Sequence, residues 1–313
     1  MLLTALALAA ATPQNCPVEL IVLGAGQDAG APQIGNNEDP AWDDPEKRLL
    51  ATSIAFVNRE SGDRYLFEAT PDIVEQLRML DEIAPVPADD TLGLEVIFLT
   101  HAHMGHYAGL MHLGVEAANT RSVDVAVMPR LKEYLTNNGP WSQLVTKNNI
   151  GFSPIELRPD GNINAYGYGG PPHDFIVIPF AVPHRDEYSE TVAYLIIAAG
   201  KQVLFVPDID SFEGWKPLGD LAGLIGLVDY AFLDSTFFDD NELDRDMSAI
   251  PHPRTKATME RLAHLPADQR AKVHFIHYNH SNPIRFADSP ESKMVVDAGF
   301  NVARRGDRHC LTD

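Results

Sequence analysis

Three histidines stand within six consecutive residues of the segment Thr100-His101-Ala102-His103-Met104-Gly105-His106. In an extended chain, side chains two residues apart point to the same side, so His101 and His103 face one direction. A turn at Gly105 brings His106 back toward them. Because imidazole is the commonest metal ligand in proteins, this spacing predicts a metal centre rather than three unrelated surface histidines.

A metal centre of this kind activates water. A bound divalent ion lowers the pKa of water from about 15.7 toward about 7, so hydroxide is available at neutral pH without a strong protein base. The sequence therefore favours a hydrolase that uses a metal-bound hydroxide on a small-molecule ester, lactone, amide or phosphodiester. One or two Zn²⁺ ions are expected, with iron or manganese as alternatives, because imidazole and carboxylate ligands suit all of these metals.

The elements that must position the histidines are short. Apolar runs, many of them rich in β-branched residues, predict strands at 18–24, 53–58, 64–68, 94–99, 123–128, 175–182, 191–198, 202–206, 230–233 and 273–276. Further segments are predicted to be helical, at 72–80, 110–118, 129–137 and 255–265. Many short strands with helices after only some of them indicate an α/β fold, an αββα sandwich of two mixed sheets flanked by helices.

Length and composition fit one large domain. The chain has 313 residues, 45% of them hydrophobic, and we expect residues 17–313 to form a single domain. Residues 1–16 form an apolar leader that ends in small residues, which predicts export to the periplasm or medium; a cytoplasmic protein is the alternative. No other segment reaches the roughly 18 to 20 apolar residues of a membrane span.

The charge excludes one class of partner. Asp and Glu number 44 against 24 Lys and Arg, a net charge of −20 that repels phosphate backbones, so a nucleic-acid partner is not expected. A small-molecule substrate is expected instead, and assembly into a homo-oligomer stays open. The two cysteines, Cys16 and Cys310, have no CxxC spacing. Free thiols are expected, with a disulfide joining the two ends of the chain as the alternative in an oxidising compartment.

A glycine-rich loop, 24–35, follows the first predicted strand. A dinucleotide-binding loop is disfavoured here, because no helical pattern follows closely and Pro32 interrupts the segment. Asp28 in this loop is a candidate pocket residue, together with Glu187 and Tyr188.

The strand and the motif Thr-His-x-His-x-x-His-x-x-Gly-Leu resemble the metal-binding motif of the metallo-β-lactamase superfamily, whose usual form is HxHxDH. Segments that resemble later motifs of that superfamily follow in the same order, namely Val182-Pro183-His184, Val203-Leu204-Phe205-Val206-Pro207-Asp208 and Phe275-Ile276-His277. The resemblance implies the αββα fold and a first metal site made by His101, His103 and His184. It further implies a second site that draws on His106 and His277, with Asp208 bridging the two.

One position departs from the superfamily pattern: Gly105 stands where the motif has an aspartate. Three outcomes are open: a one-metal site in which His106 only forms hydrogen bonds, a replacement ligand such as His280 or His252, or a preference for a different metal. Asp208 and His106 are the expected catalytic residues. Asp210 and Asp234, which stand at strand ends, are expected to support the metal-binding histidines from behind.

One branch of the superfamily fits best. Segments similar to the coenzyme PQQ synthesis protein B group include Val22–Gln33, Ala69-Thr70-Pro71-Asp72-Ile73, Leu233-Asp234-Ser235-Thr236-Phe237 and Asn279-His280-Ser281-Asn282-Pro283-Ile284. That group's cysteine-rich structural zinc site has no counterpart, since Asn36 and Asn37 stand where cysteines are expected. The resemblance implies an alternative function, an iron-dependent oxygenase or quinone-cofactor biosynthesis enzyme. A non-catalytic, metal-stabilised binding protein is the third alternative.

Overall fold

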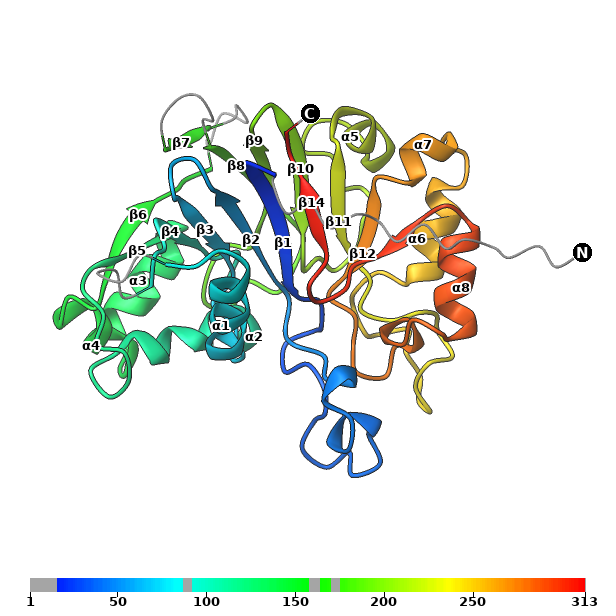
Figure 1. Ribbon diagram of the computed structural model, residues 1–313. Helices are drawn as coiled ribbons and strands as arrows, with labels where there is room; N and C mark the ends of the chain where they lie inside the picture. Colours follow the sequence, from blue (N-terminus) through cyan, green and yellow to red (C-terminus); the bar gives the residue numbers. More distant parts are fainter. Residues whose placement is uncertain (1–15, 87–91, 158–163, 170–174, 313) are drawn as a thin grey trace, which may run out of the picture.

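The computed structural model describes residues 16–86, 92–157, 164–169 and 175–312, and these form two seven-stranded sheets stacked between helices (Figure 1). In spatial order the first sheet contains β14 (Arg308–Cys310), β1 (Val18–Gly24), β2 (Ser53–Asn58), β3 (Arg64–Phe67), β4 (Val96–Phe98), β5 (Val123–Val127) and β6 (Ile150–Pro154). The second contains β13 (Asn301–Val302), β12 (Val273–Ile276), β11 (Tyr230–Asp234), β10 (Lys201–Val206), β9 (Val192–Ala198), β8 (Phe175–Ala181) and β7 (Tyr166–Tyr168). The αββα sandwich expected from the sequence is confirmed.

Helices cover the outer face of each sheet (Figure 1). Those beside the first sheet are α1 (Ile73–Ile83), α2 (Met104–Tyr107), α3 (Pro129–Asn137) and α4 (Trp141–Thr146). Those beside the second are α5 (Leu221–Leu227), α6 (Thr255–Leu262), α7 (Ala267–Arg270) and α8 (Pro290–Asp297). Four short 3₁₀ helices complete the described elements, namely η1 (Pro40–Trp42), η2 (Pro45–Lys47), η3 (Ala108–Leu113) and η4 (Pro283–Arg285).

The prediction of a helix at 110–118 is wrong. Helix η3 ends at Leu113, and turns follow it. Gly109 explains the departure, because its amide donates to the carbonyl of Ala69 at 2.9 Å and a Cβ there would lie 2.0 Å from the carbonyl oxygen of Thr70. This tight contact with the neighbouring loop holds the backbone in a 3₁₀ turn instead of a longer α-helix.

Most residues of the inner strands are apolar, because both faces of these strands are buried. In β1, Leu20 and Val22 face the core between the sheets, while Ile21 and Leu23 face the core beneath the helices. A strand covered on both faces shows a continuous apolar run rather than an alternating pattern, which is why the sequence reveals it clearly. Between the sheets, the ring of Phe67 lies 4.6–6.0 Å from aromatic rings of both sheets, namely those of Phe98, Tyr194 and Phe205.

Parallel pairing places the functional loops together. Strands β3 to β6 are parallel in the first sheet, and β10 to β13 are parallel in the second. The loops that follow β1, β4, β8, β10 and β12 all emerge at one edge of the sandwich, the lower edge in Figure 1. In sheets of this kind the carboxyl ends of the strands form the usual ligand-binding edge.

The expectation of free thiols is wrong, since Cys16 and Cys310 form a disulfide with a Cα–Cα distance of 5.7 Å. Strand β14 pairs antiparallel with β1, and Glu19 lies opposite Cys310. This pairing brings together two ends that are 294 residues apart in the chain. The predicted leader lies almost wholly outside the described residues. Within the part of the chain that is described, no helix combines the length and apolar character needed to cross a membrane.

Candidate metal centre

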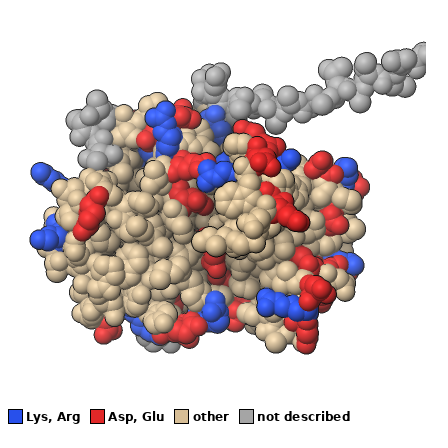
Figure 2. All heavy atoms as spheres, turned by 90° about the horizontal axis from the view of Figure 1, so that it is seen from below, with Lys and Arg blue, Asp and Glu red and all other residues tan. Residues whose placement is uncertain are grey.

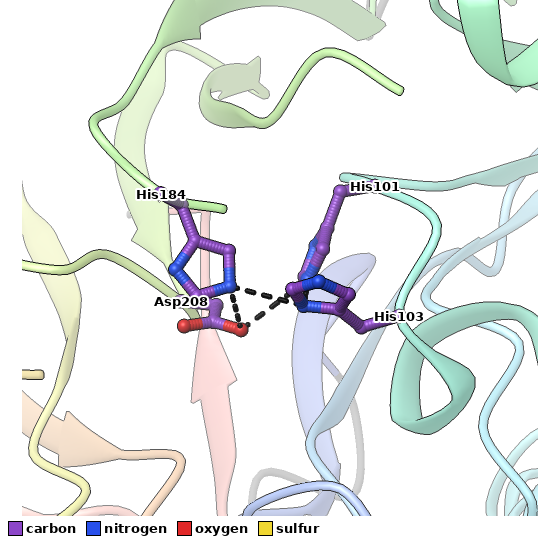
Figure 3. A group of neighbouring side chains, drawn as sticks. All are labelled: His101, His103, His184 and Asp208. Carbon is purple, nitrogen blue, oxygen red and sulfur yellow. Dashed lines mark hydrogen bonds and ion pairs between the residues drawn. The ribbon is translucent and has the colours of Figure 1, made fainter. Parts of the chain in front are cut away.

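Four side chains converge at the lower edge of the sandwich to form the first ligand group (Figure 3). They are His101, His103, His184 and Asp208, and one ligand atom from each lies within 4.8 Å of the others. His103 Nδ1 lies 2.9 Å from His101 Nε2 and 3.0 Å from His184 Nε2. Asp208 Oδ2 lies 3.3 Å from His101 Nε2 and 3.1 Å from His184 Nε2. Three imidazoles and one carboxylate therefore face a common point.

Polar groups behind the rings fix their orientation. His101 Nδ1 lies 2.9 Å from the hydroxyl of Thr100, and His184 Nδ1 lies 2.7 Å from Asp210 Oδ1. His103 Nε2 lies 3.3 Å from Glu187 Oε2. In each ring one nitrogen is held by an oxygen and the other faces the common point, the usual arrangement of metal-binding histidines.

His106 lies beside the first ligand group, with its ring centroid 4.2 Å from that of His101, in the short helix α2, whose N-cap is His103. Its Nε2 lies 3.6 Å from Asp208 Oδ2 and 3.5 Å from Asp28 Oδ1. Its Nδ1 lies 3.5 Å from Glu68 Oε1. The side chains of His106 and Glu68 are 2% and 0% exposed. His106 is therefore held between a buried carboxylate behind it and two carboxylates in front.

A further group of Asp208, Asp234, His252 and His277 also has ligand atoms within 4.8 Å of one another. His252 Nδ1 lies 3.2 Å from Asp208 Oδ1 and 3.1 Å from Asp234 Oδ2. His277 Nδ1 lies 3.2 Å from the hydroxyl of Thr236, which itself donates to Asp234 Oδ1 at 2.7 Å. Asp234 thus supports His277 from behind and also contacts His252 directly.

The facing histidines keep the Asp208 carboxylate of this cluster ionised, as its pKa shift shows. Burial alone raises the pKa of Asp208, but the facing histidines, His277 and His101 among them, outweigh burial and hold that pKa well below its usual range. Burial lowers the pKa of His106, but Glu68, Asp208 and Asp28 outweigh it and raise that pKa well above its usual value. An ionised carboxylate is the form that binds a cation.

Buried polar atoms without hydrogen-bond partners are a second, independent indication that this cluster suits a metal ion. His106 Nε2, His277 Nε2 and Asp28 Oδ1 are buried atoms with no hydrogen-bond partner. A buried polar atom left without a partner costs roughly 1 to 3 kcal/mol, and such atoms are rare in folded proteins. Several of them around Asp208 are explained by a cation that accepts electron pairs from all of them, so the donor set suits a divalent metal.

The structure brings nearly all of the residues expected from the sequence to this edge. The six expected ligands lie together, Asp210 and Asp234 lie behind them, and His252 lies beside Asp208. His280 belongs to none of the ligand groups among the described residues. Glu68 was missed by the sequence reasoning; its only signal was its place directly before the segment Ala69-Thr70-Pro71-Asp72-Ile73.

The model of the family described as Beta-lactamase superfamily domain matches residues 63–278. The chain belongs to this superfamily. Coenzyme PQQ synthesis protein B of Methylococcus capsulatus is 25% identical over 308 residues, which cover 91% of this chain and 97% of that relative. The resemblance to this branch of the superfamily is confirmed.

Solved structures of the superfamily share the fold. Zn²⁺-bound PqqB from Methylobacterium extorquens superposes with a TM-score of 0.73 at 20% identity, covering 94% of this chain and all of the other. A diphosphatase from the PhnP family superposes with a TM-score of 0.60 at 18% identity, covering 94% of this chain and 98% of the other. The family match contains His101 through His277, whereas Asp28 lies before its first residue.

Proposed function

We propose that this protein is a metal-dependent hydrolase that acts on a small-molecule ester, lactone, amide or phosphodiester. The observation that carries the proposal is the position of Asp208, whose Oδ2 lies 3.1 to 3.3 Å from two histidines of the first ligand group and 3.6 Å from His106. Two adjoining cation positions that share one carboxylate are typical of hydrolytic centres. Divalent ions bound there would polarise the substrate oxygen and lower the pKa of water.

The side chains at the mouth of the centre indicate where substrate approaches. The side chains of Asp28 and Glu187 are 48% and 49% exposed, whereas those of His101 and His277 are 1% or less exposed. We infer that substrate enters past Asp28 and Glu187, and that its reacting end lies at the metal positions formed by the buried histidines. Two carboxylates at the entrance disfavour a polyanion.

The surface around the entrance supports a small substrate over a nucleic acid. Figure 2 shows this lower face, on which Asp and Glu are interspersed with Lys and Arg, with no broad basic area. Nucleic-acid binding relies on clustered Lys and Arg that displace counterions. A net charge of −20 opposes such binding as well.

Hydrolysis is tested on purified protein supplied with zinc, manganese or iron, against a panel of esters, lactones, β-lactams, amides and phosphodiesters. We expect turnover of at least one class, and loss of that turnover in Asp208→Asn. His280→Gln is the matched control, because His280 is a nearby histidine outside the ligand groups, and it should retain full turnover. Turnover that survives Asp208→Asn, or no turnover with any metal, would contradict the proposal.

A second candidate function is an iron-dependent oxygenase or a step of quinone-cofactor biosynthesis. It is favoured by the similarity to coenzyme PQQ synthesis protein B, which extends over 91% of this chain. Two histidines and a carboxylate with an open face are also the ligands of non-haem iron oxygenases. Oxygen consumption by the iron-loaded protein with a tyrosine-derived peptide or amino acid, without hydrolysis of the panel, would favour this candidate. If both assays fail, a metal-stabilised binding protein remains.

We also propose that the protein is exported. The Cys16–Cys310 disulfide supports this, since disulfides persist in the periplasm and outside the cell and are rare in the reducing cytosol. Cell fractionation, followed by alkylation of free thiols and mass spectrometry, tests it. Recovery of the protein in the cytosol with two alkylated cysteines would contradict export.

A further inference from the structure

Gly105 stands where the superfamily motif has an aspartate, so the motif itself supplies no carboxylate to the second cation position. A Cβ on residue 105 would lie 2.4 Å from both the Cα and the Oδ1 of Asp28 and 2.9 Å from its Cβ. Real Cβ atoms do not approach neighbours this closely, so only glycine fits at position 105. The space in front of His106 that a side chain on residue 105 would enter is already filled by Asp28.

Asp28 directs a carboxylate oxygen at this position. Its side chain is half exposed overall, but Oδ1 is buried without a hydrogen-bond partner and lies 3.5 Å from His106 Nε2. Asp28, His106 and His277 form a group whose ligand atoms all lie within 4.8 Å of one another. The Nε2 atoms of His106 and His277 are likewise buried and without partners, and these two side chains are at most 2% exposed.

The backbone holds Asp28 in place through contacts with the strand end that carries His277. The amide of Gln27 donates to the carbonyl of Tyr278 at 3.0 Å, and the amide of Tyr278 donates to the carbonyl of Ala25 at 3.1 Å. Asp28 itself has φ 38°, a left-handed conformation that Asp and Asn tolerate better than most residues. The loop and the closing histidine are therefore built as one unit.

A tight turn completes the loop. Gly30 has φ 59°, and its amide donates to the carbonyl of Gln27 at 2.9 Å. A Cβ there would lie 1.9 Å from the carbonyl oxygen of Leu49, so the turn requires glycine. The glycine-rich sequence of this loop thus serves to pack the turn against the returning chain and to present Asp28, rather than to bind a dinucleotide.

From this geometry we infer that Asp28 replaces the missing motif aspartate as a ligand of a second divalent metal ion, together with His106, His277 and Asp208. The carboxylate comes from a different loop but reaches the same side of His106. His252 is the competing replacement. Its Nδ1 already contacts Asp208 and Asp234 at 3.2 and 3.1 Å, whereas Asp28 Oδ1 and the Nε2 atoms of His106 and His277 have no hydrogen-bond partner. The inference concerns metal binding and holds or fails separately from the hydrolase proposal.

The test counts metal ions on the purified, full-length protein. The chain is stripped with a chelator, incubated with excess Zn²⁺, desalted and analysed for zinc per chain; Co²⁺ titration followed by visible absorption gives the two affinities. We expect two ions in the natural protein. Asp28→Asn, which keeps the size of the side chain, should retain the first ion and weaken the second at least about tenfold, since even indirect support of a ligand is worth 10- to 100-fold.

Controls separate the competing ligand and any folding defect. His252→Gln should still bind two ions, and circular dichroism confirms that each variant is folded. Asp28→Gly, which the left-handed backbone accepts, repeats the test should the amide variant misfold.

Several outcomes would overturn the inference. It fails if the natural protein binds one ion, or if Asp28→Asn binds both ions with unchanged affinity. It also fails if His252→Gln abolishes the second ion while Asp28→Asn keeps it. Gly105→Asp alone offers the last check: a gain in affinity for the second ion over the natural protein would mean that Asp28 does not occupy the position.

Discussion

Replacing Gly105 with alanine tests the packing on which the metal centre depends. The added Cβ would lie 2.4 Å from Asp28 Cα, while carbon atoms in contact normally lie roughly 3.5 to 4.0 Å apart. The Asp28 loop must therefore retreat by about 1 Å or more. Overpacking of this kind costs roughly 1 to 3 kcal/mol of unfolding free energy. In a chain of this size each kcal/mol lowers Tm by roughly 2 °C, so we expect a fall of about 2 to 6 °C.

Thermal unfolding and zinc content of the natural protein and its variants are measured on the same preparations. The matched control is Gly226→Ala in helix α5, where the nearest atom to an added Cβ is 3.9 Å away. Alanine is favoured over glycine in an open helix by roughly 0.5 to 1 kcal/mol, so this control should match or exceed the natural Tm. Gly105→Ala should lower both Tm and the affinity for the second zinc ion. If it behaves like Gly226→Ala in both measurements, the proposed packing of Asp28 against position 105 is refuted.

Three other predictions concern the support of the fold and the first site. Burial lowers the pKa of His274 to about 3 and that of His309 to about 4, so both rings stay neutral in the folded chain while the unfolded chain takes up protons below pH ~6.5. The free energy of unfolding should therefore fall below pH ~6.5, by about 2 kcal/mol per ring at pH ~5, and His274→Phe should remove its share in urea titrations. Asp210→Asn should weaken the first metal ion roughly 10- to 100-fold in competition with a chelator, because it alters the group that orients His184. Cys310→Ser should lower the free energy of unfolding by about 2 to 5 kcal/mol, and a reducing agent should then destabilise the natural protein but not the variant.

The sequence predicted the central strands well because burial on both faces leaves an uninterrupted apolar run. It did not predict the edge strands β6, β7, β13 and β14. Strand β14 reads Arg308-His309-Cys310, and all three residues are only partly buried. An edge strand is defined by pairing with a distant partner, here β1, and such pairing leaves little trace in local composition.

The metal centre likewise has one part that follows from local sequence and one part that depends on contacts between distant segments. His101, His103 and His106 belong to one short segment, so their spacing alone predicts that they converge. Asp28 and Glu68 reach His106 from two other loops, and only the packing of the first sheet brings them there. Sequence reasoning could name Asp28 as a pocket residue but could not place it against position 105.

The position of Glu68 adds a physical reason for keeping His106 buried. Glu68 is wholly buried, has φ 72°, and accepts a long hydrogen bond from the amide of Thr100 at 3.4 Å. A buried carboxylate is costly unless it is paired, and Nδ1 of His106, 3.5 Å from Glu68 Oε1, is the neighbouring group whose N–H offsets this cost. Glu68 therefore fixes which nitrogen of His106 faces Asp208.

Moving the carboxylate from the motif to the Asp28 loop changes what the second metal position depends on. In the HxHxDH arrangement, the aspartate and the last histidine are neighbours in one turn. Here the carboxylate depends on a loop that is tied to the rest of the chain by a buried ion pair, in which Arg285 donates to both oxygens of Asp39 at 2.7 and 2.9 Å. The segment 25–50 also contains the positions where the related group has cysteines and this chain has Asn36 and Asn37. Affinity for the second ion is thereby coupled to the folding of residues 25–50, which lie before the stretch that the family match covers.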